Sequence, residues 1–414
     1  MTVKRVAVIG AGIVGVATAL WARRAGHEVA LIDRDGPASG TSYGNAGILA
    51  AAAVDQANLP GLARQVPRML LDPNEPVFLK WRSLPRLAPW LLRHLAHARP
   101  AAAEARARAL APLLTDSLEQ HQALAEGTPA ARYIVPTEFL YLYRDRVHFD
   151  ANATMWALRR NQGIAWSEED SATLARTDPG FGPAVGFAAR VPNHGYITDP
   201  GAYVRALATA FERDGGRLLR GTATAIARSG GTVTGVRLGG ETLDADTVIL
   251  CTGAWSAPLA KDLGLTLPLT TERGYHMELF GASITPRRPA MISSGAFVAT
   301  PMEGRLRLAG IAEFGDLESA PSRAPFRLLE RGIRRVLPGI TWEESREWMG
   351  HRPVLVDSTP AIGPVPEVSG AYLGLGHDHV GLTGGAKTGR ILAQLISDQR
   401  PNLDLSPYAP GRFG

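Results

Sequence analysis

The stretch VKRVAVIGAGIVGVATALWARRAGHEVALIDR, residues 3–34, decides the fold class of this chain. A short apolar segment ends at Ile9, and the glycines that follow it have the spacing G-x-G-x-x-G. Apolar residues then recur at helical spacing until Gly26, and EVALID, residues 28–33, reads as a second strand. Strand, glycine turn, helix and strand in this order predict a dinucleotide-binding βαβ unit.

Each part of this unit has a physical role. Gly10 permits the tight turn, Gly12 lets the backbone approach a pyrophosphate, and Gly15 lets the helix pack closely on the strand. Asp33 closes the second strand, where an acid accepts hydrogen bonds from the ribose hydroxyls of an adenosine. Arg34 follows it, but the acid argues against a 2′-phosphate on that ribose.

The chain does not continue as a nicotinamide-dependent enzyme would. Small residues follow Asp33 in GPASGTSYGNAGIL, residues 36–49, where another βαβ unit would stand. The sheet pattern resumes only near residue 200, with a helix over 200–214, strands near 217–227 and 232–238, and the buried strand TVILCTGA, 247–254. We therefore expect a dinucleotide domain interrupted by a large insertion.

Composition restricts the class of protein. The 414 residues are 45% hydrophobic and 20% charged, which is typical of a globular chain large enough for two domains. One cysteine excludes an internal disulfide framework and a cysteine-based metal cluster. The net charge of +5 comes from scattered arginines without a basic run, so no nucleic-acid partner is expected. The strand begins within a few residues of the N-terminus, which leaves no room for a signal peptide and favours a cytoplasmic location.

Five stretches carry a resemblance to a known family. They are VIGAGIVGVATA (8–19), TSYGNAG (41–47), GYITDPGAYVRAL (195–207), VILCTGAWS (248–256), and GHRPVLVDSTPAIGP (350–364) with the loop GHDHVGLT (376–383) behind it. In this order the chain resembles the FAD-dependent D-amino-acid oxidase superfamily, and within it the bacterial D-amino-acid dehydrogenase-like branch. Glycine and sarcosine oxidases are more distant relatives.

The resemblance implies an α/β fold of two domains. A Rossmann-like FAD-binding domain would comprise residues 1–50, 195–264 and 346–414. An α+β substrate domain with an antiparallel sheet would comprise residues 51–194 and 265–345. Within the insertions, residues 101–127 read as one long helix and 322–340 as another, while 138–145, 267–280 and 304–314 read as strands.

The resemblance also assigns contacts to the cofactor FAD. The first helix turn and Asp33 would hold the pyrophosphate and adenosine ribose, and TSYGNAG would lie along the pyrophosphate and flavin. Gly381, Leu382 and Thr383 would begin the last helix at the flavin pyrimidine edge, where its amides stabilise the negative charge of the reduced ring. The expected contacts are Gly10, Gly12, Ile13, Val14, Gly15, Asp33, Arg34, Ser42, Asn45, Ala46, Gly47, Gly253, Trp255, Gly381, Leu382 and Thr383.

Three residues are candidates for the substrate site. Arg352, in the family's G-x-R-P pattern, would bind the substrate carboxylate as a bidentate guanidinium. His379 is a candidate for substrate contact, with a packed structural histidine as the alternative. Tyr275 is a candidate wall of the site, although only one of Tyr275 and His276 can face the flavin. The HDH sequence alone lacks the further ligands that a metal requires, so no metal site is expected.

The segment 77–100 mixes Trp81, Trp90 and leucines with arginines, which suits contact with a membrane surface. A helical hairpin packed near the entrance of the site is the alternative. Peripheral contact would fit an enzyme at the inner membrane that passes electrons to a quinone.

The function implied is oxidative deamination of an amino acid, a D-amino acid in the first place. A hydride would pass from Cα to flavin N5, and the imino acid would hydrolyse to a 2-oxo acid and ammonia. A quinone or another carrier is the expected electron acceptor, and oxygen is the alternative. The competing reading is a flavin subunit of a multi-subunit secondary amine dehydrogenase of the sarcosine, opine or proline type.

Overall fold

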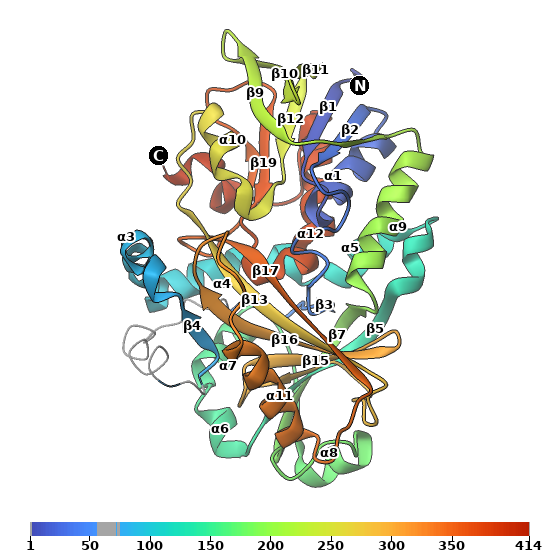
Figure 1. Cartoon of the computed structure of the whole chain (residues 1–414), viewed down its shortest axis with the longest axis vertical. Helices are drawn as coiled ribbons and strands as arrows, with labels where there is room; N and C mark the ends of the chain where they lie inside the picture. The colour runs from blue at the N-terminus through green and yellow to red at the C-terminus, as the bar shows by residue number, and fades with distance from the viewer. Residues whose placement is uncertain (1, 56–71, 73–74, 414) are drawn as a thin grey trace.

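The computed structural model describes residues 2–55, 72 and 75–413. Figure 1 shows an upper part built on one sheet and a lower part built on a second, with both chain ends in the upper part. The predicted dinucleotide unit is present as β1 (Arg5–Ile9), α1 (Ile13–Arg24) and β2 (Glu28–Asp33). The glycine turn therefore joins β1 directly to the start of α1.

The upper sheet has the strand order β18-β19-β12-β1-β2-β8. Neighbouring strands run parallel except β18 and β19, which pair antiparallel. The remaining strands of this sheet are β8 (Arg217–Arg220), β12 (Thr247–Leu250), β18 (Ala361–Pro364) and β19 (Ala371–Leu375). Segments more than 300 residues apart thus build one sheet, as expected for an interrupted domain.

Different layers cover the two faces of the upper sheet. One face packs against α1, α9 (Pro200–Arg213) and α12 (Gly381–Ile396) through a shared apolar cluster. The other face packs against α10 (Ala257–Asp262) and an antiparallel three-stranded sheet of β9 (Ala223–Ser229), β10 (Thr232–Leu238) and β11 (Glu241–Asp244). The single strand expected near 217–227 is therefore two strands, β8 and β9, that belong to different sheets.

The helices α1 and α12 approach closely because α12 carries glycine at the contact. A Cβ atom on Gly389 would lie 2.6 Å from backbone atoms of Ala17 and Thr18. A Cβ atom on Gly385 would lie 3.0 Å from the Ile13 side chain. This contact brings the first turns of both helices to the same edge of the upper sheet.

The lower sheet is larger and follows the path β17-β13-β16-β15-β14-β5-β7-β3, with β4 on β16 and β6 on β7. Most pairs are antiparallel as predicted, but β14 with β5 and β16 with β4 are parallel, so the sheet is mixed. The strands are β3 (Ile48–Leu49), β4 (Val77–Leu79), β5 (Ile134–Tyr143), β6 (Ser167–Asp170), β7 (Phe187–Ile197), β13 (Leu269–Phe280), β14 (Ala290–Ile292), β15 (Phe297–Met302), β16 (Arg305–Phe314) and β17 (Glu344–Leu355).

One predicted domain boundary falls inside a strand. β17 pairs with β13 continuously from Glu344 to Leu355, so residues 346–355 lie in the lower sheet. The motif pattern placed them with the upper part because it did not show this pairing. A second predicted boundary, between residues 194 and 195, falls inside β7, and β3 lies in the lower sheet although it is within the predicted FAD-binding segment 1–50. The division into domains stays a prediction.

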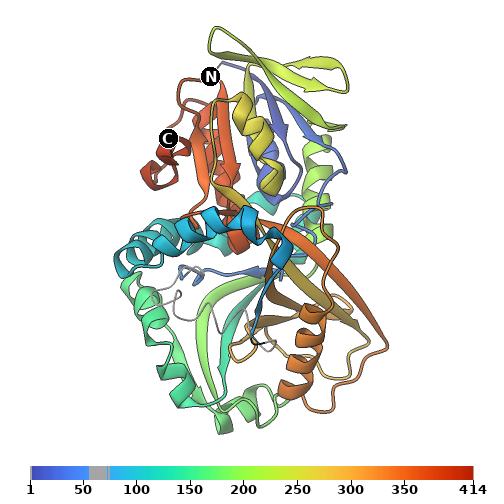
Figure 2. The ribbon, with the colours of Figure 1, turned by 60° about the vertical axis from the view of Figure 1, so that its left-hand side comes forward.

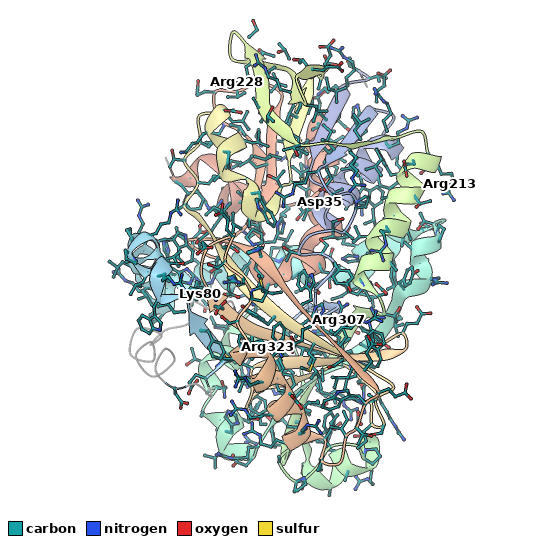
Figure 3. The ribbon with its side chains drawn as sticks, viewed as in Figure 1. Asp35, Lys80, Arg213, Arg228, Arg307 and Arg323 are labelled. Atoms are coloured by element: carbon teal, nitrogen blue, oxygen red, sulfur yellow. The ribbon has the colours of Figure 1, made fainter. Side chains whose placement is uncertain are left out.

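Helices close the outside of the lower sheet. α11 (Ala324–Val336) packs with Leu328, Leu329, Ile333 and Val336 buried, as its spacing predicted. Short helices α6 (Arg146–Asp150), α7 (Ala153–Asn161) and α8 (Ser171–Thr177) accompany β5 to β7. Arg307 is fully buried within this part, whereas Arg213, Arg228 and Arg323 lie at separate places on the surface (Figure 3).

Helices from the first insertion lie between the two sheets. α3 (Leu84–Ala96) and α4 (Pro100–Leu114) cross the molecule there, in blue to cyan in Figure 2. The single helix predicted over 101–127 is instead α4 and α5 (Ser117–Ala125), because the chain leaves helical geometry at Asp116. Within the described residues, no helix is long and apolar enough to cross a bilayer.

Candidate active site

A cavity of about 880 Å³ lies where the carboxyl ends of the upper strands meet the lower sheet. The first turns of α1 and α12, the loop 39–46 and one face of β13, β16 and β17 all contribute to its wall. This is where ligands bind in open α/β sheets. Of the predicted site residues, all except Gly15 and Gly47 line it.

The first turn of α1 forms a cradle of backbone amides. Gly12 precedes the helix in an extended conformation and has no side chain with which to cap it, and the first turn holds no acid. The amide of Ile13 donates to the Ser42 hydroxyl oxygen at 2.9 Å, so this hydroxyl can pass a hydrogen bond on into the cavity. Such an uncapped helix start attracts a phosphate group.

Gly15 and Gly47 act through packing. A Cβ atom on Gly15 would overlap the carbonyl oxygen of Gly10, which itself turns at φ +102°. Gly47 has φ +82°, and a Cβ atom there would lie 2.7 Å from the Ile197 carbonyl oxygen. Both glycines therefore permit the close backbone packing that positions the cavity wall, although neither lines the cavity itself.

The adenosine end is built around Asp33. Its Oδ2 accepts the Ala11 amide at 2.8 Å, and its Oδ1 accepts the amides of Asp35 and Gly36, each at 2.9 Å. Oδ2 still has room for a further donor, such as a ribose hydroxyl. Beside it, the Arg34 guanidinium lies 4.5 Å from the centre of the Trp255 ring, near Gly253.

Side chains of the lower sheet hold the loop 41–47 by its carbonyl groups. Arg307 donates to the carbonyls of Tyr43 and Asn45 at 3.0 and 2.6 Å. Thr300 donates to the carbonyl of Ala46, and His276 Nδ1 to that of Gly44. The loop therefore presents Ser42, Asn45 and Ala46 to the cavity in a defined position.

The first turn of α12 also opens on the cavity. It begins at Gly381 with neither a side-chain cap nor an acid in its first turn, and Leu382 and Thr383 line the wall. Burial lowers the pKa of His121 to about 4, so its ring is neutral. Its Nε2 donates to the Leu382 carbonyl at 2.8 Å, and its Nδ1 accepts from Tyr203 at 2.7 Å. The His121 imidazole therefore holds the first turn of the last helix.

These features together fit a flavin adenine dinucleotide. Two uncapped helix starts face one cavity, glycines occupy the places where a pyrophosphate would approach the backbone, and an acid stands at the ribose position. Cys251 lines the same cavity as a buried free thiol, and burial raises its pKa to about 12. A thiol in that state is protonated and behaves as a small apolar group.

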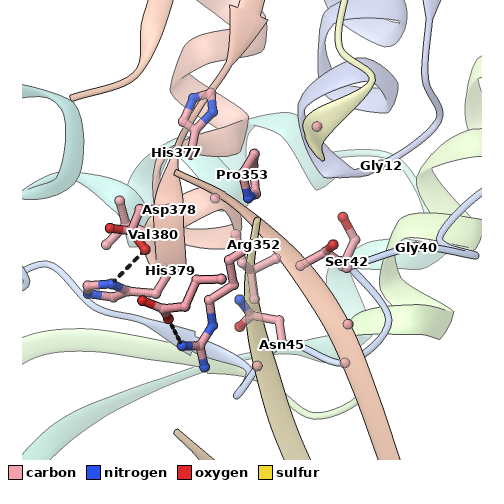
Figure 4. A pocket seen from close by; sticks show the side chains of 18 of the residues that line it. Gly12, Gly40, Ser42, Asn45, Arg352, Pro353, His377, Asp378, His379 and Val380 are labelled. Atoms are coloured by element: carbon pink, nitrogen blue, oxygen red, sulfur yellow. Dashed lines mark hydrogen bonds and ion pairs between the residues drawn. The ribbon is translucent and has the colours of Figure 1, made fainter. Parts of the chain in front are cut away.

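Arg352 extends from β17 into the cavity (Figure 4). It faces Glu272 of β13 across the strand pair and makes an ion pair with it. A Cβ atom on Gly274 would lie 2.6 Å from Arg352 Nε, so the guanidinium fits over this position only because it is glycine. The floor of the site is thus a strand segment in which Gly274 leaves room for one cationic side chain, that of Arg352.

His379 and Asp378 lie beside Arg352 (Figure 4). The His379 side chain is 39% exposed and lines the cavity, whereas Asp378 is buried and has a positive φ of 52°. Burial alone would lower the pKa of His379, but the neighbouring Asp378 carboxylate outweighs this effect and raises it.

Tyr275 lines the cavity where a wall residue was predicted, and most of its contacts lie behind that wall. Its ring packs against Phe326 of α11, and its hydroxyl donates to Glu313 at 2.6 Å. Burial raises its pKa to about 12. Tyr275 touches the cavity, but its polar group is engaged in the core between the sheet and α11.

Sequence reasoning missed Glu272, Gly274 and Asp378. Glu272 and Gly274 stand in TERGYHMEL, where an acid inside an otherwise buried strand is a usable signal. The pair Asp55 and Arg159 was also missed; both are buried, line the cavity and form an ion pair at 2.7 Å. The sequence around Asp55 and around Arg159 contains no motif with a distinctive spacing.

Comparisons with known proteins agree with this geometry. The model of the DAO family, described as FAD dependent oxidoreductase, matches residues 5–395. The chain is 36% identical to the D-amino-acid oxidase of Bradyrhizobium diazoefficiens, with 99% of each protein covered. It is 30% identical to the D-amino acid dehydrogenase of Sinorhizobium medicae, over 99% of this chain and 100% of that protein. The structure of glycine oxidase from Geobacillus kaustophilus matches with a TM-score of 0.75 at 22% identity, over 99% of both chains.

Replacing Gly12 with valine tests the cradle. The valine side chain would occupy the space through which a pyrophosphate approaches the helix start, so we expect purified Gly12→Val protein to contain little FAD. The flavin-to-protein absorbance ratio measures this, and circular dichroism controls for folding. A folded variant with full FAD occupancy would contradict the assignment of the cradle.

Proposed function

The chain belongs to the DAO family of FAD-dependent oxidoreductases, and from this membership we propose that it oxidises an amino acid to an imino acid. Water then hydrolyses the imino acid to a 2-oxo acid and ammonia. The proposed substrate is a D-amino acid, because relatives with 30% identity or more include a D-amino-acid oxidase and D-amino acid dehydrogenases.

The position of Arg352 is the observation that carries the proposal. Its guanidinium lies in the same cavity as the first turn of α12, on a strand floor made bare by Gly274. A planar fork of donors in a partly buried site recognises a carboxylate in two-point fashion. The substrate carboxylate would be held there, with Cα directed toward the α12 end of the cavity.

FAD, when bound, would supply the capacity to accept two electrons and a proton equivalent from the substrate. The residues that would hold it are Gly10, Gly12, Ile13, Val14, Asp33 and Arg34 at the nucleotide end, and Ser42, Asn45, Ala46, Gly381, Leu382 and Thr383 toward the flavin. The amides at the start of α12 stabilise negative charge. The chain itself orients the substrate and excludes water, which supply much of the rate in such a reaction.

We also propose an electron acceptor and a location for the protein. A quinone or another carrier is the proposed acceptor, with oxygen as the alternative, for a cytoplasmic protein that touches the inner membrane. The segment around α3 supports this contact, because Trp81 and Leu92 are 58% and 69% exposed beside exposed Arg82, Arg86 and Arg93.

We expect the protein to sediment with vesicles that contain anionic lipid and to stay in solution with neutral vesicles. The matched comparison is Leu92→Ser, which removes an exposed apolar side chain and should weaken the sedimentation. Equal behaviour with both kinds of vesicle would contradict the membrane contact.

The function is tested by anaerobic titration of the holoprotein with separate panels of D-amino acids, L-amino acids and N-methyl or cyclic amino acids. We expect D-amino acids to bleach the flavin absorbance. Bleaching by the N-methyl or cyclic panel alone would favour the secondary amine class. A bound flavin that no panel reduces would favour a subunit that depends on partner chains.

Arg352→Leu tests the carboxylate clamp. Each charge-assisted hydrogen bond that is lost contributes roughly 1.5–3 kcal/mol, so kcat/KM should fall by about a hundred-fold or more while FAD stays bound. Because leucine leaves Glu272 unpaired, Arg352→Lys serves as a second variant that keeps the charge but loses the fork. Turnover and KM like those of the wild type in both variants would contradict the clamp.

A further inference from the structure

Arg352 is not an isolated positive charge in the cavity. Glu272 is 7% exposed, lines the cavity and pairs with Arg352 through Oε1. Its second oxygen, Oε2, has no hydrogen-bond partner among the residues that the structure describes. This oxygen is not enclosed by protein atoms, so it can accept a hydrogen bond from a ligand in the cavity.

Asp378 adds a second buried carboxylate to this place. It is 5% exposed and adopts φ +52°, a conformation that costs energy for a residue other than glycine. Its Oδ1 lies 3.4 Å from His379 Nδ1, which is longer than a normal hydrogen bond. Strained residues with poorly satisfied polar atoms often belong to ligand sites.

The charges that act on Glu272 come from two elements. Arg352 of β17 faces it directly, and Asp378 and His379 act on it from the turn before α12. His94 of α3, Arg106 of α4 and Asp55 interact in turn with Asp378 or His379. The negative charges of Glu272 and Asp378 thus lie close to the positive charge of Arg352 and to the His379 ring.

This arrangement complements a zwitterion better than a simple anion. A substrate carboxylate on Arg352 would draw the guanidinium away from Glu272 and leave that carboxylate less compensated. An ammonium group on the adjacent carbon of the substrate would restore the balance with a charge-assisted hydrogen bond to Oε2. A 2-hydroxy acid of the same shape has no positive charge to offer there.

We propose that Glu272 binds the substrate ammonium and accepts one of its protons before the amino acid is oxidised. This role rests on the proposed function, because the amine must be neutral when the hydride leaves Cα. An N–H bond breaks and an O–H bond forms on Oε2, so that Glu272 becomes neutral. The nitrogen keeps the electron pair, which then forms the second C–N bond of the imino acid.

The surroundings of Glu272 suit this exchange. Burial raises its pKa above the ordinary range, although the Arg352 charge opposes the rise. A carboxylate made more basic in this way is a better match for an ammonium donor. Asp378 is the supporting charge, since its proximity makes Glu272 still more basic.

The experiment compares the pH profiles of kcat/KM for the wild-type holoenzyme and Glu272→Gln. The wild-type profile should rise well below the pKa of the free substrate ammonium. In Glu272→Gln the rise should move up to that pKa, with a loss of about 10²- to 10⁴-fold at neutral pH that high pH restores. A wild-type rise at the ammonium pKa, or an unmoved rise in the variant, would overturn the proposal.

Glu169→Gln is the matched control. Glu169 lies on β6 of the lower sheet, is buried and pairs with Arg190, but it does not line the cavity. We expect the rise in its pH profile to stay at the wild-type position. A shift equal to that of Glu272→Gln would show a general effect of removing a buried charge and would overturn the proposal.

A second measurement separates proton transfer from the mere positioning of Arg352. Propionate, which has a carboxylate but no amine, is titrated against the oxidised holoenzyme while the flavin absorbance is followed. Glu272→Gln should bind propionate at least as tightly as the wild type, since the competing carboxylate charge is gone. Binding weakened tenfold or more, with a loss of turnover equal at every pH, would assign Glu272 a positioning role only.

Glu272→Asp keeps the experiment decisive if the glutamine variant does not fold. Its shorter carboxylate should still accept a proton, so the rise should stay below the ammonium pKa while the rate falls. A rise at the ammonium pKa in this variant would overturn the proposal. Failure of the wild type to oxidise any amino acid would instead contradict the proposed function itself.

Discussion

The site depends on how the lower sheet holds the backbone of the loop 41–47. Arg307 is fully buried, pairs with Glu278 at 2.7 Å and donates to two carbonyl groups of that loop. A buried guanidinium needs both a counter-charge and acceptors for its remaining N–H groups, and the arrangement supplies them. The loop leaves the upper sheet at one end and enters β3 of the lower sheet at the other. Its fixed position therefore sets the two sheets against each other and keeps the cavity between them open.

Missing side chains shape this cavity as much as those that are present. Glycine allows α1 and α12 to approach, turns the chain before α1 and clears the floor under Arg352. Neither helix start carries an acid in its first turn, so both keep their positive ends for a ligand. Away from Asp33 and Arg34 at the nucleotide end, a second group of charged side chains lines the cavity beside the start of α12, in Arg352, Glu272, Asp378 and His379. One end therefore suits an anionic dinucleotide, and the other suits a small zwitterion.

The parts of the site that sequence could predict are those encoded over short stretches. The turn at Gly10 and Gly12, the acid at Asp33 and the start of α12 all follow from local spacing and backbone freedom, and the structure places each at the cavity. Arg352 was found through a family pattern, since nothing in its own neighbourhood distinguishes it from other arginines. Strand alternation could not say which of Tyr275 and His276 would look onto the cavity, and in the structure Tyr275 lines it.

By itself the sequence determined the dinucleotide unit, the interruption of that domain and the start of the last helix, because helical and strand periods and glycine spacing act over a few residues. The tertiary structure alone decided that Glu272 faces Arg352 across 80 residues of chain and that β17 joins the lower sheet. It also decided that residues 101–127 form two helices and that Asp378 is buried beside His379. These features depend on strand register and on contacts between distant segments, which have no short-range pattern because their energy exists only once both partners are in place.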